Sequence, residues 1–136
     1  MKTILRRPLI LWDPSRHDDQ PYTASIIFRR DDPYAVTILI PDHDTNKMHE
    51  VVIARALLID GLMEPTGELG FAYVEPHAVQ EYVTLTLPLR NGLRELYAER
   101  VPLESFRDAT CRMVPLPEQR PIAQADLERW LAGVAA

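Results

Sequence analysis

Residues 29–40, RRDDPYAVTILI, place two aspartates and a proline directly before an apolar run. Proline fixes φ at about −65° and moves the preceding residue out of the helical region, so Asp31, Asp32 and Pro33 predict a rigid corner. The residues after the corner alternate between apolar and other side chains, as in a strand with one buried face. We expect this strand to end at Pro41. Its core side would be formed by Tyr34, Val36, Ile38 and Ile40.

The segment before the corner predicts the partner strand of a hairpin. Residues 22–30 alternate in the same way, and the two runs are expected to pair. The apolar side of the first run consists of Tyr22, Ala24, Ile26 and Phe28. In residues 1–14, MKTILRRPLILWDP, Arg6, Arg7 and Pro8 interrupt the apolar residues and no small-residue cleavage site follows. We therefore expect a further strand here and no signal peptide.

Downstream of the corner, a strand from Met48 to Ala54 leads into a short helix, ARALLIDGL. Its Asp60-Gly61 pair is typical of a helix C-terminus, with the glycine in the left-handed conformation. The helix is apolar on nearly every side, through Leu57, Leu58, Ile59, Leu62 and Met63. Because these side chains cannot all face one core, we expect some of them to pack against a second surface, in the same chain or in another subunit.

A strand is expected at Leu69 to Val74, and residues 81–99, EYVTLTLPLRNGLRELYAE, predict a second hairpin. Its Asn91-Gly92 pair is the preferred chemistry of a two-residue type I′ turn. With that turn, Leu87 opposes Leu96.

From Pro102 the apolar spacing becomes helical, which predicts a helix that ends before Pro115. Its core stripe consists of Leu103, Phe106, Thr110 and Met113. A last helix is expected near the C-terminus, with an apolar stripe of Leu127, Trp130, Leu131 and Val134. The order of about seven strands and two to three helices indicates a single α+β domain over residues 1–136 rather than repeated βαβ units.

Composition indicates a soluble protein of a reducing compartment. No apolar run approaches the ~20 residues of a membrane span. The single cysteine, Cys111, excludes an internal disulfide, so we expect a cytoplasmic protein. The formal charge of −5 opposes binding to a phosphate backbone unless basic residues such as Arg29 and Arg30 gather on one face.

Signals for catalysis or metal binding are weak. The chain has no glycine-rich phosphate loop, no GxSxG elbow, no HExxH and no CxxC. Residues 42–46, DHDTN, imitate the start of a calcium loop, but Lys47 replaces its glycine and Ile53 its bidentate glutamate. Residues 17–19, HDD, offer only half of a metal site. We assign no catalytic, cofactor-binding or metal-binding residue.

Together these motifs resemble the SsgA-like family of sporulation and cell-division proteins of actinomycetes. The resemblance extends from about Leu9 to Leu131 and depends most on the DPYAV turn, the xARxLLxxGL helix and the PxGE loop. The matching positions are Asp32, Pro33, Tyr34, Ala35, Val36, Ala54, Arg55, Leu57, Leu58, Gly61, Leu62, Pro65, Gly67, Glu68, Phe106, Thr110, Val114 and Pro115. The chain departs from the family pattern, as a divergent member does, at Val51, Ile53, Ala56, Leu69, Gly70 and Ala109.

The resemblance implies a non-enzymatic protein that controls where septa form in sporulating hyphae. It implies that the chain helps to recruit the tubulin-like division protein FtsZ or SsgA-like paralogues, and that it acts at septum sites. It also implies curved, barrel-like antiparallel sheets similar to the Whirly-type fold, assembled as a trimer. The candidate partner or subunit contacts are Asp32, Pro33, Tyr34, Arg55, Leu57, Leu58 and Leu62.

Two other classes of function stay open beside this adaptor. A single-strand nucleic-acid binder would share the related fold, but it needs a basic groove with exposed aromatic rings. A small enzyme or ligand-binding domain would have to be built from His17, His43 and neighbouring carboxylates in one pocket.

Overall fold

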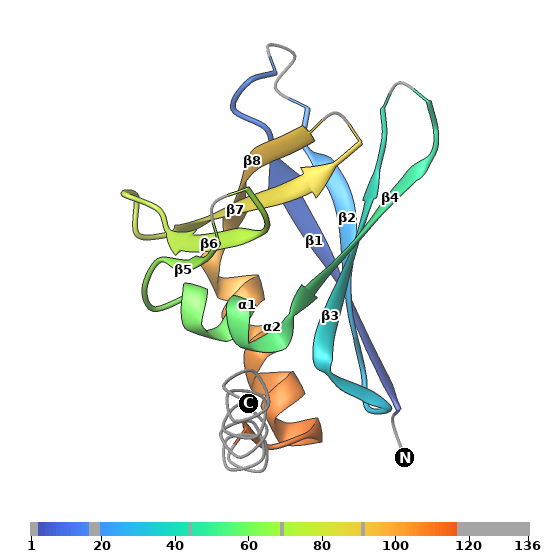
Figure 1. The fold of residues 1–136 in the computed structure, drawn as a ribbon, viewed down its shortest axis with the longest axis vertical. Coiled ribbons are helices and arrows are strands. Elements are labelled where there is room, and N and C mark those ends of the chain that lie inside the picture. Colours follow the sequence, from blue (N-terminus) through green and yellow to red (C-terminus); the bar gives the residue numbers. More distant parts are fainter. Residues whose placement is uncertain (1–2, 17–19, 44, 69, 91, 117–136) are drawn as a thin grey trace, which may run out of the picture.

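The computed structural model describes residues 3–16, 20–43, 45–68, 70–90 and 92–116. Within these ranges the chain forms eight strands and two helices (Figure 1). In chain order they are β1 (Ile4–Trp12), β2 (Tyr22–Arg29), β3 (Asp32–Pro41), β4 (Met48–Ala54), α1 (Arg55–Gly61), β5 (Thr66–Gly67), β6 (Tyr73–Pro76), β7 (Tyr82–Leu89), β8 (Gly92–Glu99) and α2 (Arg100–Met113).

The strands form one antiparallel sheet in the order β4-β3-β2-β1-β8-β7-β6-β5. Its two halves are joined in the middle by a short ladder, in which β1 pairs with β8 only at Leu11 with Ala98 and Trp12 with Tyr97. Figure 1 shows the consequence: strands β1 to β4 curl away from strands β5 to β8, and both helices lie at one end of the half-barrel.

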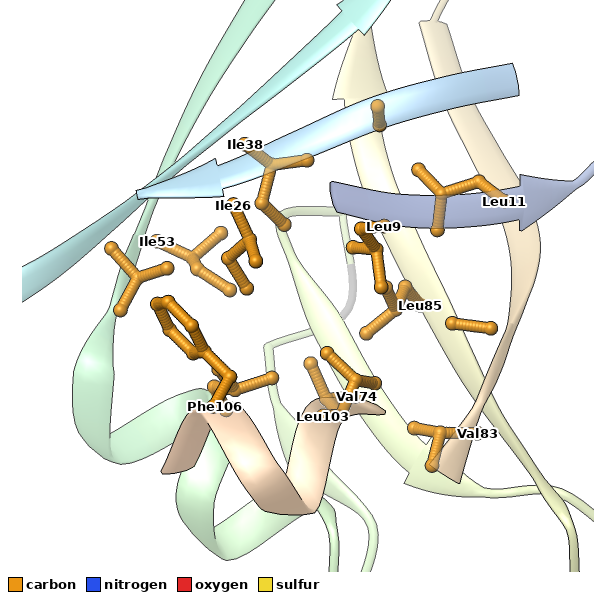
Figure 2. Close-up of a cluster of buried hydrophobic side chains, with 14 of the residues drawn as sticks. Leu9, Leu11, Ile26, Ile38, Ile53, Val74, Val83, Leu85, Leu103 and Phe106 are labelled. Carbon is orange, nitrogen blue, oxygen red and sulfur yellow. The ribbon is translucent and has the colours of Figure 1, made fainter. Parts of the chain in front are cut away.

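The core fills the space between the two halves of the sheet. Inward-facing aliphatic side chains of β1 to β4 meet those of β6 to β8, and α1 and α2 close the lower end. Figure 2 shows Phe106 of α2 pointing toward Ile53 and Ile26, with Leu103 beside Val74. Each of these side chains is at most 4 % exposed, so the helices are integral to the core.

Most of the sequence-based expectations are confirmed. The N-terminal strand, the 22–40 hairpin and the 48–54 strand are present as β1 to β4. The second hairpin is present as β7 and β8, and the helix that begins near Pro102 and ends before Pro115 is α2. The α+β class with curved antiparallel strands is therefore confirmed, with eight strands rather than about seven. The predicted C-terminal helix and residues 17–19 lie outside the described residues.

The corner differs from the prediction in one respect. Arg29 pairs with Asp32 whereas Phe28 pairs with Val36, so β3 carries a bulge between these pairs. The bulge takes Tyr34 out of the alternation of its strand, and Tyr34 is 54 % exposed. The expectation that its ring lies on the core side was wrong, although Val36, Ile38 and Ile40 are buried as expected.

Gly61 is not a left-handed helix cap, contrary to the sequence-based prediction. It lies inside α1, and the residue that caps the helix, Leu62, has right-handed φ and ψ of −70° and −22°. The glycine is required by packing instead, because a Cβ at this position would lie 2.4 Å from the Cβ of Val74 on β6.

The second hairpin has a different register from the predicted one. Leu89 pairs with Gly92, which places Leu85 opposite Leu96 and Leu87 opposite Arg94. The partners are shifted by two residues, so the same side chains still face the core. The strand expected at 69–74 is also displaced toward the C-terminus, because β6 begins only at Tyr73 and ends at Pro76.

Candidate interaction surface and polar cleft

The corner between β2 and β3 is an exposed and firmly held surface. Asp31, Asp32 and Tyr34 are exposed, and Pro33 is half-buried. The N–H of Arg30 donates a 2.8 Å hydrogen bond to the carbonyl oxygen of Thr3, which ties the turn to the start of β1. We call Asp31, Asp32, Pro33 and Tyr34 the corner patch.

Helix α1 turns most of its predicted contact residues inward. Arg55, Leu58 and Leu62 are each 1 % exposed, and Leu57 is half-buried against the core. The outward side of α1 carries Ala56 and Asp60, and Met63 in the turn after the helix is 76 % exposed. The apolar surface available to another subunit is therefore Met63 with the exposed parts of Leu57 and Ile59.

Arg55 is a buried cation that the sequence did not distinguish from a surface residue. Its Nη2 donates a 2.6 Å hydrogen bond to the carbonyl oxygen of Val114, and its guanidinium carbon lies 4.9 Å from the centre of the Phe28 ring. Its Nε and Nη1 have no hydrogen-bond partner. The side chain thus connects the start of α1 to the residue that follows α2.

A second feature is a polar cleft at the end of the half-barrel away from the helices, near the turns of the β3–β4 and β7–β8 hairpins (Figure 1). It encloses about 80 Å³. Its lining consists of Asp13, Arg16, Tyr22, Ile40, Asp42, His49, Leu89 and Arg94. These side chains come from both halves of the sheet, so the cleft lies where the halves approach each other.

The polar groups of the cleft include one ion pair and one contact between a histidine and a carboxylate. Asp13 has a side chain only 2 % exposed, and its Oδ2 lies 3.6 Å from Nη1 of Arg94. Its Oδ1 accepts hydrogen bonds from the N–H and hydroxyl of Ser15, at 2.9 and 2.6 Å. His49 Nε2 lies 3.3 Å from Asp42 Oδ2. These contacts connect β1 to β8 and β3 to β4, which stabilises this end of the sheet.

The histidines named from the sequence are not the ones in the polar cleft. His17 lies outside the described residues, and the ring of His43 packs against Tyr22 with centroids 4.6 Å apart. The histidine in the lining is His49. Across the described ranges, no three His, Cys, Asp or Glu side chains are placed to hold a metal ion. The free thiol of Cys111 is half-buried on α2.

Neither of the helices in the described part of the chain is long and apolar enough to span a membrane.

The chain matches known proteins by family and by structure. The family model of the Streptomyces sporulation and cell division protein SsgA matches residues 23–119. A structure from a study entitled "Mutations in SsgB correlate to longitudinal cell division during sporulation of Streptomyces coelicolor" is similar with a TM-score of 0.74 and 31% identity. That similarity covers 86% of this chain and 93% of the other.

A second similar structure is an SsgA-like sporulation-specific cell division protein from Thermobifida fusca. It has a TM-score of 0.71 and 25% identity, over 96% of this chain and 95% of the other. No curated protein sequence matches the chain. The family match and the two structures agree with the order of motifs in the sequence, and the chain belongs to the SsgA family of sporulation and cell division proteins.

Proposed function

We propose that this protein is a non-enzymatic adaptor of sporulation-specific cell division. It acts in the cytoplasm at septum sites, where it recruits FtsZ or SsgA-like paralogues. The observation that carries the proposal is the 31% identity, over 86% of the chain, to the structure from the study of SsgB mutations and cell division. The corner patch and the outer side of α1 provide the contact surface.

The corner patch is well suited to protein recognition. Tyrosine is enriched among the residues that dominate binding energies, because it offers a large apolar ring and a polar hydroxyl. Tyr34 presents such a ring, and the exposed aspartates Asp31 and Asp32 precede it in the same turn. Its backbone is held by the bulge in β3, so little conformational entropy is lost when a partner binds.

The outer side of α1 supports a homo-oligomer, with the trimer implied by the family resemblance as its expected form. Apolar side chains on this side remain partly exposed to solvent, namely Leu57, Ile59 and Met63. Burying this surface against another subunit would be favourable at about 25 cal/mol per Å².

The test uses co-sedimentation of the full chain with polymers of purified FtsZ and with purified paralogues. The double variant Asp32→Ala/Tyr34→Ala is expected to lose binding. The matched control is Leu93→Ala, an exposed apolar residue on β8 away from the corner patch, and it is expected to bind normally. A fluorescent fusion expressed in sporulating hyphae should form septal ladders, whereas a diffuse signal from a folded fusion would contradict the proposal.

A second candidate is a single-strand nucleic-acid binder, and exposed aromatic rings on the outer face of the sheet favour it. Trp12 is 38 % exposed and lies beside His77, Tyr82 and Tyr97 in one cleft. Such rings are able to stack on bases. A gel shift with single-stranded DNA that weakens steeply as salt rises would support this function over the adaptor.

A further inference from the structure

The outer face of the sheet carries a cleft of about 360 Å³ lined by Trp12, His77, Val79, Tyr82 and Tyr97, which we call the aromatic cleft. Strand pairing explains its position. Trp12 pairs with Tyr97, and opposed residues of an antiparallel ladder share a face. Their chain neighbours Leu11 and Leu96 are fully buried, so Trp12 and Tyr97 point away from the core.

The rings of the aromatic cleft stand at steep angles to one another. The His77 ring centre lies 4.5 Å from that of Tyr97 and 6.2 Å from that of Tyr82, with interplanar angles of 65° and 75°. The N–H of Val79 donates a 2.9 Å hydrogen bond to His77 Nδ1, which holds the imidazole in place. The three rings therefore form one continuous aromatic surface, whose faces and edges point in different directions.

The surroundings of the aromatic cleft are acidic. Glu95 Oε1 accepts a 3.3 Å hydrogen bond from the Tyr97 hydroxyl. Glu99 is opposite Tyr82 in the ladder, so its carboxylate lies on the same face. Burial raises the pKa of Tyr97, and the negative charge of Glu95 and its hydrogen bond raise it further. The five lining residues include no lysine or arginine.

The side chain of Arg100, three residues after Tyr97, forms its hydrogen bonds with backbone carbonyl oxygens rather than with Glu95 or Glu99. Arg100 donates from Nε to the carbonyl oxygen of Gln80 at 3.0 Å and from Nη1 to that of Leu62 at 2.7 Å. The aromatic cleft therefore combines electron-rich ring faces with carboxylates, the combination that attracts a cation.

We propose that the aromatic cleft binds an arginine side chain presented by a segment of a partner protein. A guanidinium stacks on aromatic faces and pairs with a carboxylate through its planar fork, and both partners are present here. An anionic phosphate chain is disfavoured by the same carboxylates. The site goes beyond the proposed adaptor function and does not depend on it, since it shares no residue with the corner patch.

The test measures chemical shifts of the full chain labelled with ¹⁵N, titrated with the blocked peptide acetyl-Gly-Arg-Gly-amide. The indole N–H signal of Trp12 is identified by its loss in Trp12→Phe. We expect a saturable shift of this signal with the arginine peptide. The control peptide carries citrulline, which has nearly the same shape without the charge, and it should bind at least ten-fold more weakly.

Variants separate the ring contribution from that of the carboxylate. Tyr97→Phe keeps the ring and should retain binding within about three-fold, whereas Tyr97→Leu should lose at least ten-fold. Glu95→Gln should weaken binding and reduce its dependence on salt. Tyr34→Leu, an exposed tyrosine in the corner patch, is the matched control and should bind normally. If Tyr97→Leu does not fold, Trp12→Leu removes another exposed ring of the aromatic cleft and should weaken binding in the same way.

Three results would overturn the proposal. The first is no shift of the Trp12 signal at any peptide concentration. The second is equal binding of the citrulline and arginine peptides, which would show that charge is not recognised. The third is tighter binding of a thymidine oligonucleotide than of the arginine peptide, which would assign the rings to base stacking.

Discussion

Arg55 and Val114, which lie 59 positions apart in the sequence, are joined by a 2.6 Å hydrogen bond from Nη2 to the carbonyl oxygen. This contact fixes the start of α1 against the end of α2. The guanidinium also lies over the Phe28 ring of β2, so one side chain holds both helices to the sheet. The role of Arg55 in the described structure is therefore internal.

Replacing Arg55 should show this internal role as a loss of stability. Arg55→Ala removes the hydrogen bond and leaves a cavity, which we expect to cost about 2–4 kcal/mol in the free energy of unfolding. Arg55→Met fills most of the space and removes the two unpaired nitrogens, Nε and Nη1, so its loss should stay below about 1.5 kcal/mol. Urea denaturation with equal m-values measures both changes.

The control for these variants is Arg112→Ala on the exposed side of α2, which should change stability by no more than about 0.5 kcal/mol. Equal losses in Arg55→Ala and Arg55→Met would contradict the packing argument. Unchanged stability in Arg55→Ala would show that the residue does not hold the helices.

Gly61 offers a test between two physical reasons for a glycine. If close packing on Val74 requires it, Gly61→Ala should destabilise the protein by about 1–3 kcal/mol despite the better helix propensity of alanine. Gly61→Asn should then be worse than Gly61→Ala, because its side chain is larger.

A left-handed cap gives the opposite order, since asparagine tolerates that conformation better than alanine. Thermal unfolding of the two variants at one pH decides between these orders. A more stable Gly61→Asn would indicate a left-handed cap at the end of α1 and would contradict the packing explanation.

The bulge in β3 predicts different effects at two positions of the same strand. Tyr34→Ala should change the free energy of unfolding by no more than about 0.5 kcal/mol, because the ring is 54 % exposed. Ile38→Ala should cost about 2–5 kcal/mol, because that side chain is fully buried. Chemical denaturation gives both numbers, and a Tyr34→Ala loss above 2 kcal/mol would place the ring in the core after all.

The elements of the fold were predictable because their signals are local. Alternation with one buried face identified the long strands, and helical spacing together with Pro102 and Pro115 identified α2. The register of the second hairpin was not predictable in this way. A shift by two residues leaves every side chain on the same face, so the apolar pattern does not distinguish Leu87 opposite Leu96 from Leu87 opposite Arg94.

The features that were missed depend on contacts between distant segments. The reason for Gly61 is the Val74 side chain, and the burial of Arg55 depends on Val114. The aromatic cleft draws Trp12, His77 and Tyr97 from three separate strands or turns. No local pattern connects them, although alternation around Trp12 and Tyr97 does place each ring on the outer face.

The pKa of Tyr97 predicts a specific dependence on pH. Burial, followed by the charge of Glu95 and its hydrogen bond, raises this pKa above its ordinary value of 10.0. The folded state therefore keeps the phenol protonated at a pH where the unfolded state has begun to ionise. The contribution of Tyr97 to stability is complete below its ordinary pKa and is lost as the pH rises toward the raised value.

Ultraviolet titration of tyrosinate absorbance, taken as the difference between the wild type and Tyr97→Phe, measures this ionisation directly. We expect its midpoint above 10.0, the ordinary value. Glu95→Gln removes the charge, so it should move the midpoint of Tyr97 back toward that value. The control is Tyr34→Phe, which removes an exposed tyrosine in the corner patch and should leave the ionisation of Tyr97 unchanged. A Tyr97 midpoint at or below the ordinary value, or one that does not respond to Glu95→Gln, would contradict the described contact between the phenol and the carboxylate.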